Sequence, residues 1–167
     1  ITAPNSYFST AMVITKVGAT PVFADIDAHT YTLEPQAVAA AITPQTRALI
    51  PVHLCGQPAD MDPLITLAKK HKLTLIEDCC QAHGAKYKGK PVPVTGLGAF
   101  SFYPGKNLGS FGDGGALVTN SARMATLVKQ LRNDGSLKKY HHHLIGSKSR
   151  LDTIQASVLN IKLKYLN

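Results

Sequence analysis

The sequence predicts an α/β fold in which helices flank a mostly parallel sheet. Three segments carry this prediction: apolar runs at 48–52 and 73–77, and between them residues 60–71, whose apolar side chains recur at helical spacing. Strand, helix and strand in this order are typical of parallel strands joined by right-handed crossovers. A chain of 167 residues, 44% of them hydrophobic and 17% charged, suits one folded domain with a core.

The other elements extend this alternation along the chain. Apolar residues at helical spacing over 7–17 end at Gly18, which is typical of a helix C-terminus, and residues 20–24 predict a strand. Further on we expect a short helix at 35–42 with proline in its first turn, a loop or edge hairpin at 87–96, a strand at 115–119, a helix at 121–132 capped by Asn120 or Ser121, and a last helix at 151–166.

Charge and composition exclude several classes of function. The formal net charge is +8, but the basic residues are scattered and form no stripe interleaved with aromatics, so we expect no nucleic-acid partner. We interpret this charge first as a solvated surface and second as a basic mouth that attracts a diphosphate substrate. No apolar run approaches the ~20 residues that span a bilayer, so no membrane partner is expected. The three cysteines are too few and wrongly spaced for a zinc site or a disulfide framework. We therefore expect reduced thiols, which indicate the cytoplasm.

Possible metal ligands occur in two groups, and we expect a metal site at neither. Asp25 and Asp27 end a predicted strand, where carboxylates usually form a solvated turn. The three consecutive histidines at 141–143 cannot all point into one site from a helix or a strand. His53 follows the apolar run at 48–52, and two interpretations of it stay open: it lines a cleft, or it packs at the strand end.

One lysine stands directly after a tight turn. Residues 99–103 lead into Pro104-Gly105-Lys106, and five glycines between 105 and 115 allow the backbone to approach a flat or phosphorylated ligand closely. A lysine in apolar surroundings loses its proton readily and acts as an amine nucleophile. We therefore interpret Lys106 as the residue that forms a Schiff base with pyridoxal phosphate. On this stretch alone, a solvated loop lysine is an equal alternative.

A carboxylate in a second stretch favours the cofactor. Asp78 ends the apolar run at 73–77, and ligands of parallel α/β sheets bind beyond the carboxyl ends of the strands. Pyridoxal phosphate acts as an electron sink only while its ring nitrogen is protonated, and a neighbouring carboxylate keeps it so. Alone, Asp78 would be a helix cap or a turn residue. Lys106 follows 28 residues later, enough for the chain to return to the same sheet edge.

The sequence resembles the DegT/StrS family of sugar aminotransferases, which are pyridoxal-phosphate enzymes. Two blocks carry the resemblance, IEDCCQAHGA at 76–85 and residues 100–109, and further blocks agree in the same order: PNSYFSTA at 4–11, GATPVFADID at 18–27, IPVHLCGQPADMDP at 50–63, GDGGALVTN at 112–120 and SRLDTIQA at 149–156. The resemblance covers essentially the whole chain and implies the large domain of the aspartate-aminotransferase fold (fold-type I).

That fold would be incomplete here, because family members are more than twice this length and the chain begins with Ile1 rather than Met. The resemblance implies that residues 1–167 belong to the cofactor-binding large domain. Residues 151–167 would begin the helix that leads to a small C-terminal domain outside this chain. It also implies a homodimer with its active site at the subunit boundary.

The resemblance assigns roles to further residues. Ser101 corresponds to a serine that hydrogen-bonds the cofactor phosphate, Gln81 to a residue against the pyridine ring, and Tyr7 to an aromatic on the other face of that ring. Tyr103 and Asn107 flank the lysine and would be near the sugar.

A phosphate of the neighbouring subunit would be contacted from the segment 146–152. Lys148 stands there where asparagine is expected, so either Lys148 or Arg150 would make the contact.

The implied activity is transfer of an amino group from a donor such as glutamate to the keto group of a nucleotide-linked sugar. Lys106 argues against related dehydratases, which carry histidine at this position. The turn sequence YPGKNLG is more similar to members that aminate carbon 3 than carbon 4. Two alternatives stay open: a non-catalytic regulator or scaffold of the same fold, and another fold-type I enzyme such as a lyase acting on amino acids.

Overall fold

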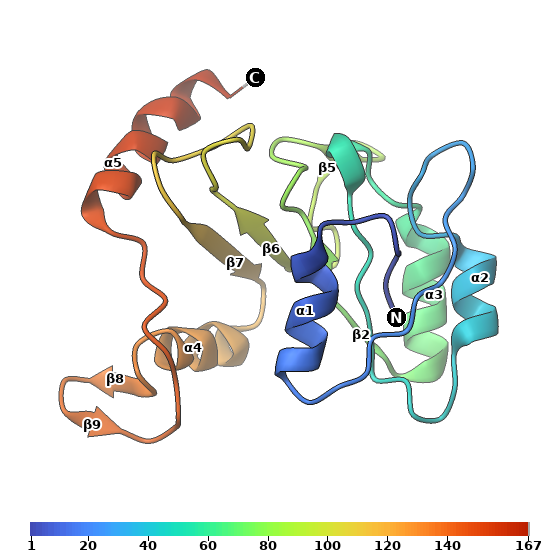
Figure 1. Cartoon of the computed structure of the whole chain (residues 1–167), viewed down its shortest axis with the longest axis horizontal. Helices are drawn as coiled ribbons and strands as arrows, with labels where there is room; N and C mark the ends of the chain where they lie inside the picture. The colour runs from blue at the N-terminus through green and yellow to red at the C-terminus, as the bar shows by residue number, and fades with distance from the viewer. Residues whose placement is uncertain (167) are drawn as a thin grey trace.

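The computed structural model describes residues 1–166 and has the predicted alternation of strands and helices (Figure 1). Its elements in chain order are α1 (Phe8–Lys16), α2 (Pro35–Ala41), β1 (Ala48–Leu49), η1 (Leu54–Gly56), α3 (Met61–His71), β2 (Thr74–Leu75), β3 (Glu77–Asp78), β4 (Lys86–Tyr87), β5 (Lys90–Pro91), β6 (Leu97–Ser101), β7 (Gly115–Thr119), α4 (Ala122–Leu131), β8 (Ser136–Lys138), β9 (His141–His142), α5 (Thr153–Lys162) and η2 (Leu163–Tyr165).

The central strands are parallel, as predicted. β1 pairs in parallel with β2, and a further bridge joins Val52 to Asp78 at the end of β3. β3 pairs in parallel with β6, with Asp78 opposite Ala99. β6 then pairs antiparallel with β7 over five residues. This order brings the ends of β3 and β6 side by side, so the stretches that follow these two strands meet at one edge of the sheet.

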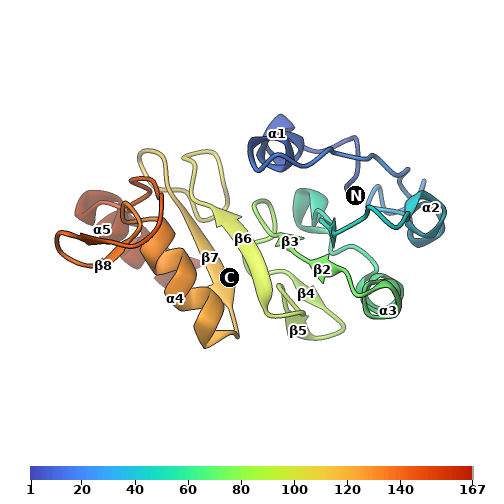
Figure 2. The ribbon, with the colours of Figure 1, turned by 90° about the horizontal axis from the view of Figure 1, so that it is seen from below.

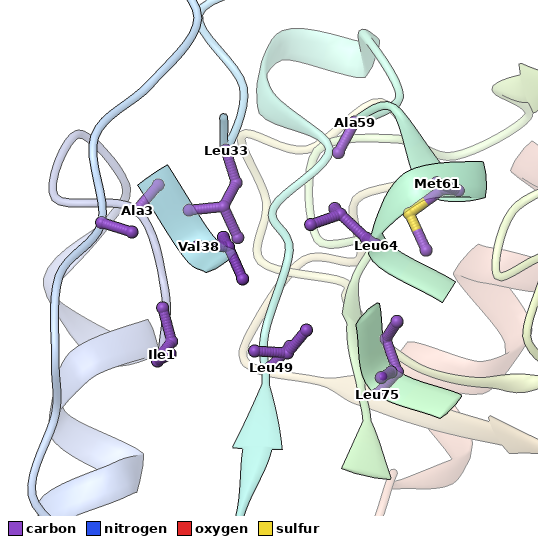
Figure 3. Packing of buried hydrophobic residues seen from close by; sticks show 11 residues of the cluster. Ile1, Ala3, Leu33, Val38, Leu49, Ala59, Met61, Leu64 and Leu75 are labelled. Carbon is purple, nitrogen blue, oxygen red and sulfur yellow. The ribbon is translucent and has the colours of Figure 1, made fainter. Parts of the chain in front are cut away.

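Helices cover the two faces of this sheet. Figure 2 shows α1 on one side and α3 and α4 on the other, where α3 contacts β2 and α4 contacts β7. The main core lies between α2, α3 and the parallel strands, and Figure 3 shows Leu33, Val38, Leu49 and Leu64 pointing toward one another there. Each is essentially fully buried, and burying one such side chain stabilises the fold by about 1.5–3 kcal/mol.

Most predicted elements are confirmed, including the edge hairpin, which β4 and β5 form. Ser121 rather than Asn120 caps α4, because its hydroxyl accepts a hydrogen bond from the Met124 N–H. The last helix begins at Thr153, two residues later than predicted, because the Asp152 carboxylate caps it by accepting from the Gln155 N–H. Residue 167, which falls in the predicted start of a connecting helix, lies outside the described residues, and that domain assignment stays a prediction.

The strand predicted at 20–24 is wrong. Only Phe23 forms a bridge there, to Thr2, with the Thr2 N–H donating to the Val22 carbonyl and the Ala24 N–H donating to the Thr2 carbonyl. Pro4 has no N–H to donate to the Ala24 carbonyl at the next step of this pairing, and the Ile26 N–H donates to the Asp25 carboxylate instead.

Candidate active site

A cavity of about 930 Å³ lies between α1 and the carboxyl ends of the parallel strands. All five residues predicted to bind a cofactor line it: Tyr7, Asp78, Gln81, Ser101 and Lys106. They come from the start of α1, the end of β3 and the turn after it, the end of β6, and the loop after β6. Stretches as far apart in the sequence as Tyr7 and Lys106 therefore share one site.

Asp78 is held by hydrogen bonds to both carboxylate oxygens. The Thr10 hydroxyl donates to Oδ2 at 2.8 Å, and the Cys80 N–H donates to Oδ1 at 3.1 Å. These two contacts fix the carboxylate plane at the cavity wall. Sequence reasoning missed Thr10, although Tyr7 and Thr10 are three positions apart at the start of a predicted helix, a spacing that puts two side chains on one face.

Lys106 lies half-buried at the cavity, in a loop shaped by glycine. Its N–H donates to the Tyr103 carbonyl at 2.9 Å, which closes the Pro104-Gly105 turn. A Cβ on Gly109 would stand 2.4 Å from the Pro104 carbonyl oxygen, so only glycine fits where the loop folds back on this turn. The sequence predicted close backbone approach here, and the contact that requires it is with the loop itself.

Cys80 also lines the cavity, but it is a poor competitor for nucleophilic chemistry. Burial and then the neighbouring Asp78 carboxylate raise the pKa of its thiol to about 12, although the Lys106 charge opposes that shift. The Cys80 thiol therefore stays protonated at neutral pH, which leaves the Lys106 amine as the stronger candidate nucleophile of the two.

Gln81, Ser101 and Tyr7 occupy different parts of the cavity. The Gln81 side-chain oxygen accepts from the Cys55 N–H at 2.9 Å, and the Ser101 hydroxyl oxygen accepts from the Tyr103 N–H at 3.3 Å. Tyr7 stands at the mouth with 73% of its surface exposed. Ser101 keeps its hydroxyl hydrogen available for a ligand, and the Tyr7 ring presents an accessible face.

A buried polar network lies directly behind Asp78. The Glu77 carboxylate accepts hydrogen bonds from His53 Nε2 at 3.0 Å, the Val94 N–H at 2.8 Å, and the N–H of Thr95 at 2.7 Å, with the Thr95 hydroxyl as a fourth donor. Burial alone would raise the pKa of Glu77, but the hydrogen bonds from His53, Thr95 and Val94 outweigh it and hold this pKa below its usual value.

His53 is therefore a packed strand-end histidine rather than a cleft residue. It is fully buried, and its Nδ1 accepts from the Ala59 N–H at 3.1 Å, which leaves the ring proton on Nε2 to face Glu77. Together with Cys79 these two side chains bring possible metal-ligand atoms within 4.8 Å of one another. The ring nitrogens of His53 and the carboxylate oxygens of Glu77 already form hydrogen bonds within the protein, and burial raises the pKa of the Cys79 thiol. This group is therefore poorly suited to bind a metal ion.

The two groups of possible metal ligands at which no metal site is expected lie outside the cavity lining. Asp27 forms a turn by accepting from the N–H groups of His29 and Thr30, as predicted. The histidines at 141–143 are exposed on the β8–β9 hairpin.

Tyr103 lines the cavity, whereas Asn107, Lys148 and Arg150 are exposed residues that are not among its lining. Lys148 Nζ lies 4.0 Å from the carboxylate of Asp134.

A lysine in the loop after β6 and a carboxylate at the end of β3 line one cavity of an α/β fold, which is the arrangement expected of a fold-type I enzyme. The chain belongs to the DegT/DnrJ/EryC1/StrS aminotransferase family, whose model matches residues 1–167. The resemblance seen in the sequence is thus confirmed, and so is the fold class.

Similar proteins include enzymes and proteins named for a regulatory role. The chain is 49% identical over 168 residues to dTDP-3-amino-3,4,6-trideoxy-alpha-D-glucose transaminase of Streptomyces venezuelae, covering 100% of this chain and 44% of that protein. It is 48% identical over 168 residues to the pleiotropic regulatory protein of Geobacillus stearothermophilus, covering 100% of this chain and 45% of that protein.

The fold agrees closely with a solved structure. That of S. venezuelae DesV in complex with a ketimine intermediate matches with a TM-score of 0.96 and 50% identity, covering 98% of this chain and 44% of DesV. The chain thus spans under half the length of the proteins it matches.

Proposed function

We propose that the full-length protein containing this chain transfers an amino group from an amino-acid donor such as glutamate to a nucleotide-linked keto-sugar, with pyridoxal phosphate held by Lys106. The observation that carries the proposal is that Lys106 and Asp78, 28 residues apart in sequence, line one cavity together with Tyr7, Gln81 and Ser101. An amine nucleophile and an oriented carboxylate are the two groups this cofactor requires of a protein.

The residues present fit the cofactor. A volume of about 930 Å³ lies within the range of small-molecule sites, roughly 300–1,000 Å³. We assign Ser101 to the phosphate, Gln81 to one face of the ring, Tyr7 to the other face and Asp78 to the ring nitrogen. Family members depend on pyridoxal phosphate, and one solved relative carries its amino form, PMP.

Each of these residues has a physical task in the proposed reaction. When bound, pyridoxal phosphate supplies an electron sink for the charge that develops at the donor α-carbon. Asp78 favours the protonated ring nitrogen through its negative charge, which the Thr10 and Cys80 hydrogen bonds hold in place. Lys106 would hold the cofactor, and its free amine would move the proton at the donor α-carbon as general base and then as general acid.

The sugar keto group at carbon 3 is the preferred acceptor in this proposal. Several relatives are named for sugars with nitrogen or a keto group at that carbon. A homodimer in the cytoplasm completes the proposal. Three large aromatic side chains, those of Tyr7, Phe8 and Phe111, are exposed and support a subunit contact. The free thiols of the three cysteines are consistent with a reducing compartment.

A regulator without catalysis is the second candidate, favoured by the names of two relatives, a pleiotropic regulatory protein and a sensory transduction protein. The intact set of Lys106, Asp78, Gln81 and Ser101 supports the enzyme instead, because a binding module needs none of these pairings. A lyase acting on amino acids is the third candidate and requires a binding site for a substrate carboxylate.

The substrate test uses the full-length protein loaded with pyridoxal phosphate. We expect glutamate to convert the bound cofactor to its amino form, seen as a change in its visible absorbance. A 3-keto sugar linked to dTDP or UDP should then restore the original spectrum faster than the matching 4-keto sugar. Conversion by neither sugar would contradict the proposed transamination, and preference for the 4-keto sugar would contradict only the choice of carbon 3.

A further inference from the structure

The loop that carries Lys106 is closed on itself. We call residues 102–114 the lysine loop. The Phe102 N–H donates to the Gly114 carbonyl, and both the N–H and the hydroxyl of Ser110 donate to the Phe102 carbonyl, at 2.8 and 2.7 Å. Gly109 packs against the Pro104 carbonyl with no room for a side chain. A displacement of the segment 109–111 is therefore transmitted to the turn that bears Lys106.

Helix α5 holds this same segment from outside. Lys162 Nζ donates to the Gly109 carbonyl at 2.6 Å, and the Gln155 side-chain oxygen accepts from the Phe111 N–H at 2.8 Å. The two side chains are seven positions apart, so two helical turns place them on one face of α5. Figure 1 shows α5 beside the loop that joins β6 to β7.

The Lys162 contact has the features of a specific interaction. It joins groups 53 residues apart in sequence and is partly buried, and the glycine that accepts it is fully enclosed. A charged donor to a carbonyl makes a shorter and stronger hydrogen bond than a neutral donor does. Lys164, two positions further on, is exposed and offers a matched lysine for comparison.

We propose that Lys162 and Gln155 of α5 are positioning residues that set the location of Lys106 by holding Gly109 and Phe111. The inference rests on the proposed function for its catalytic meaning, since Lys106 is the residue assigned to the cofactor. The contact itself is independent of that function. Neither residue touches the cavity, so their effect on Lys106 would pass through the lysine loop.

The test compares Lys162→Met, Lys162→Arg and Lys164→Met in the full-length protein, with Gln155→Met as a second way of releasing the loop. Hydrogen–deuterium exchange of peptides over 103–112 in cofactor-free protein reports the loop directly. Borohydride trapping of added pyridoxal phosphate on Lys106, quantified by mass spectrometry over a concentration series, reports the lysine. Urea unfolding midpoints identify any variant that has lost its fold.

We expect Lys162→Met and Gln155→Met to raise exchange over 103–112. Trapping on Lys106 should weaken about tenfold in Lys162→Met, the effect of losing one charged hydrogen bond, and less in Gln155→Met, whose lost bond is neutral. Lys162→Arg should restore both readouts, and Lys164→Met should match the wild type. Unchanged exchange in both Lys162→Met and Gln155→Met would overturn the claim that α5 holds the lysine loop. Raised exchange with unchanged trapping would overturn the claim that these residues position Lys106. If wild-type Lys106 traps nothing, the proposed function fails, while the exchange data still decide whether α5 holds the loop.

Discussion

Replacing Glu77 with glutamine tests whether the buried network behind Asp78 is built around a charged carboxylate. Glutamine keeps the shape but presents NH₂ where one oxygen stood. If NH₂ faces Thr95, the hydroxyl can rotate to accept, but the Thr95 N–H loses its acceptor. If it faces the other side, the N–H groups of His53 and Val94 both lose theirs. At least one buried N–H is therefore left without a partner in either orientation.

The expected cost is about 3 kcal/mol at pH 7, because an unsatisfied buried donor costs about 1–3 kcal/mol and the remaining bonds change from charged to neutral acceptors. Urea unfolding of the full-length protein, followed by circular dichroism, measures it. Glu34→Gln is the matched control. Its oxygen accepts one bond from the Gln36 N–H at 3.3 Å in an exposed setting, and a glutamine oxygen can still accept there, so the control should cost less than about 0.5 kcal/mol.

The pH dependence of this difference has a definite sign. Because the folded pKa of Glu77 is lowered, its contribution to stability is present above the unfolded value near 4.5 and is lost as pH falls through the folded pKa. The gap between wild type and Glu77→Gln should thus be steady around neutral pH and shrink in acid below 4.5. A cost no larger than that of Glu34→Gln, or a gap that persists in acid, would refute the reasoning.

Two further predictions concern the cavity wall and the lysine loop. Thr10→Val should weaken pyridoxal phosphate binding about tenfold, because Asp78 loses one of its two orienting hydrogen bonds, whereas Thr10→Ser should bind like the wild type. Fluorescence titration with the cofactor measures both affinities. Equal binding by the Val and Ser variants would exclude the Thr10 hydroxyl as the cause. Gly109→Ala should lower the unfolding midpoint and raise hydrogen exchange over 103–112, because its Cβ would stand 2.4 Å from the Pro104 carbonyl oxygen. Gly105→Ala is the control: its Cβ would meet no atom closer than 3.7 Å, so the midpoint and the exchange should stay unchanged. Normal exchange in Gly109→Ala would show that the loop accommodates a Cβ beside the Pro104 carbonyl and would contradict this prediction.

The site was predictable from the sequence where chemistry and strand ends coincide. Asp78 stands out because it ends an apolar run, and Lys106 because it follows another apolar run after a Pro-Gly turn; parallel pairing then brings the ends of the two strands together. Gln81, Ser101 and Tyr7 needed the family resemblance, since a glutamine, a strand serine or a helical tyrosine alone carries no signal of cofactor binding.

Other features were not predictable because they depend on tertiary contacts. Thr10, Lys162 and Gln155 act on partners 44 to 68 residues away, and no local pattern reports such distances. The strand expected at 20–24 had the right composition, but it forms a single bridge, because its partner segment continues into Pro4, which has no N–H for the next step. Glu77 and Asp78 are adjacent in sequence, yet strand alternation sends their side chains to opposite faces. The Glu77 carboxylate bonds His53 and Thr95 in the interior, whereas the Asp78 carboxylate bonds Thr10 at the cavity.

The most direct measurement of the central assignment is the identity of the residue that holds pyridoxal phosphate in the full-length protein. The loaded protein is reduced with borohydride, digested, and searched by mass spectrometry for the phosphopyridoxyl group. We expect the group on Lys106, together with a visible absorbance band that borohydride removes and that a Lys106→Ala variant lacks. A group found on another lysine, or a full-length protein that gains neither band nor adduct, would contradict the account.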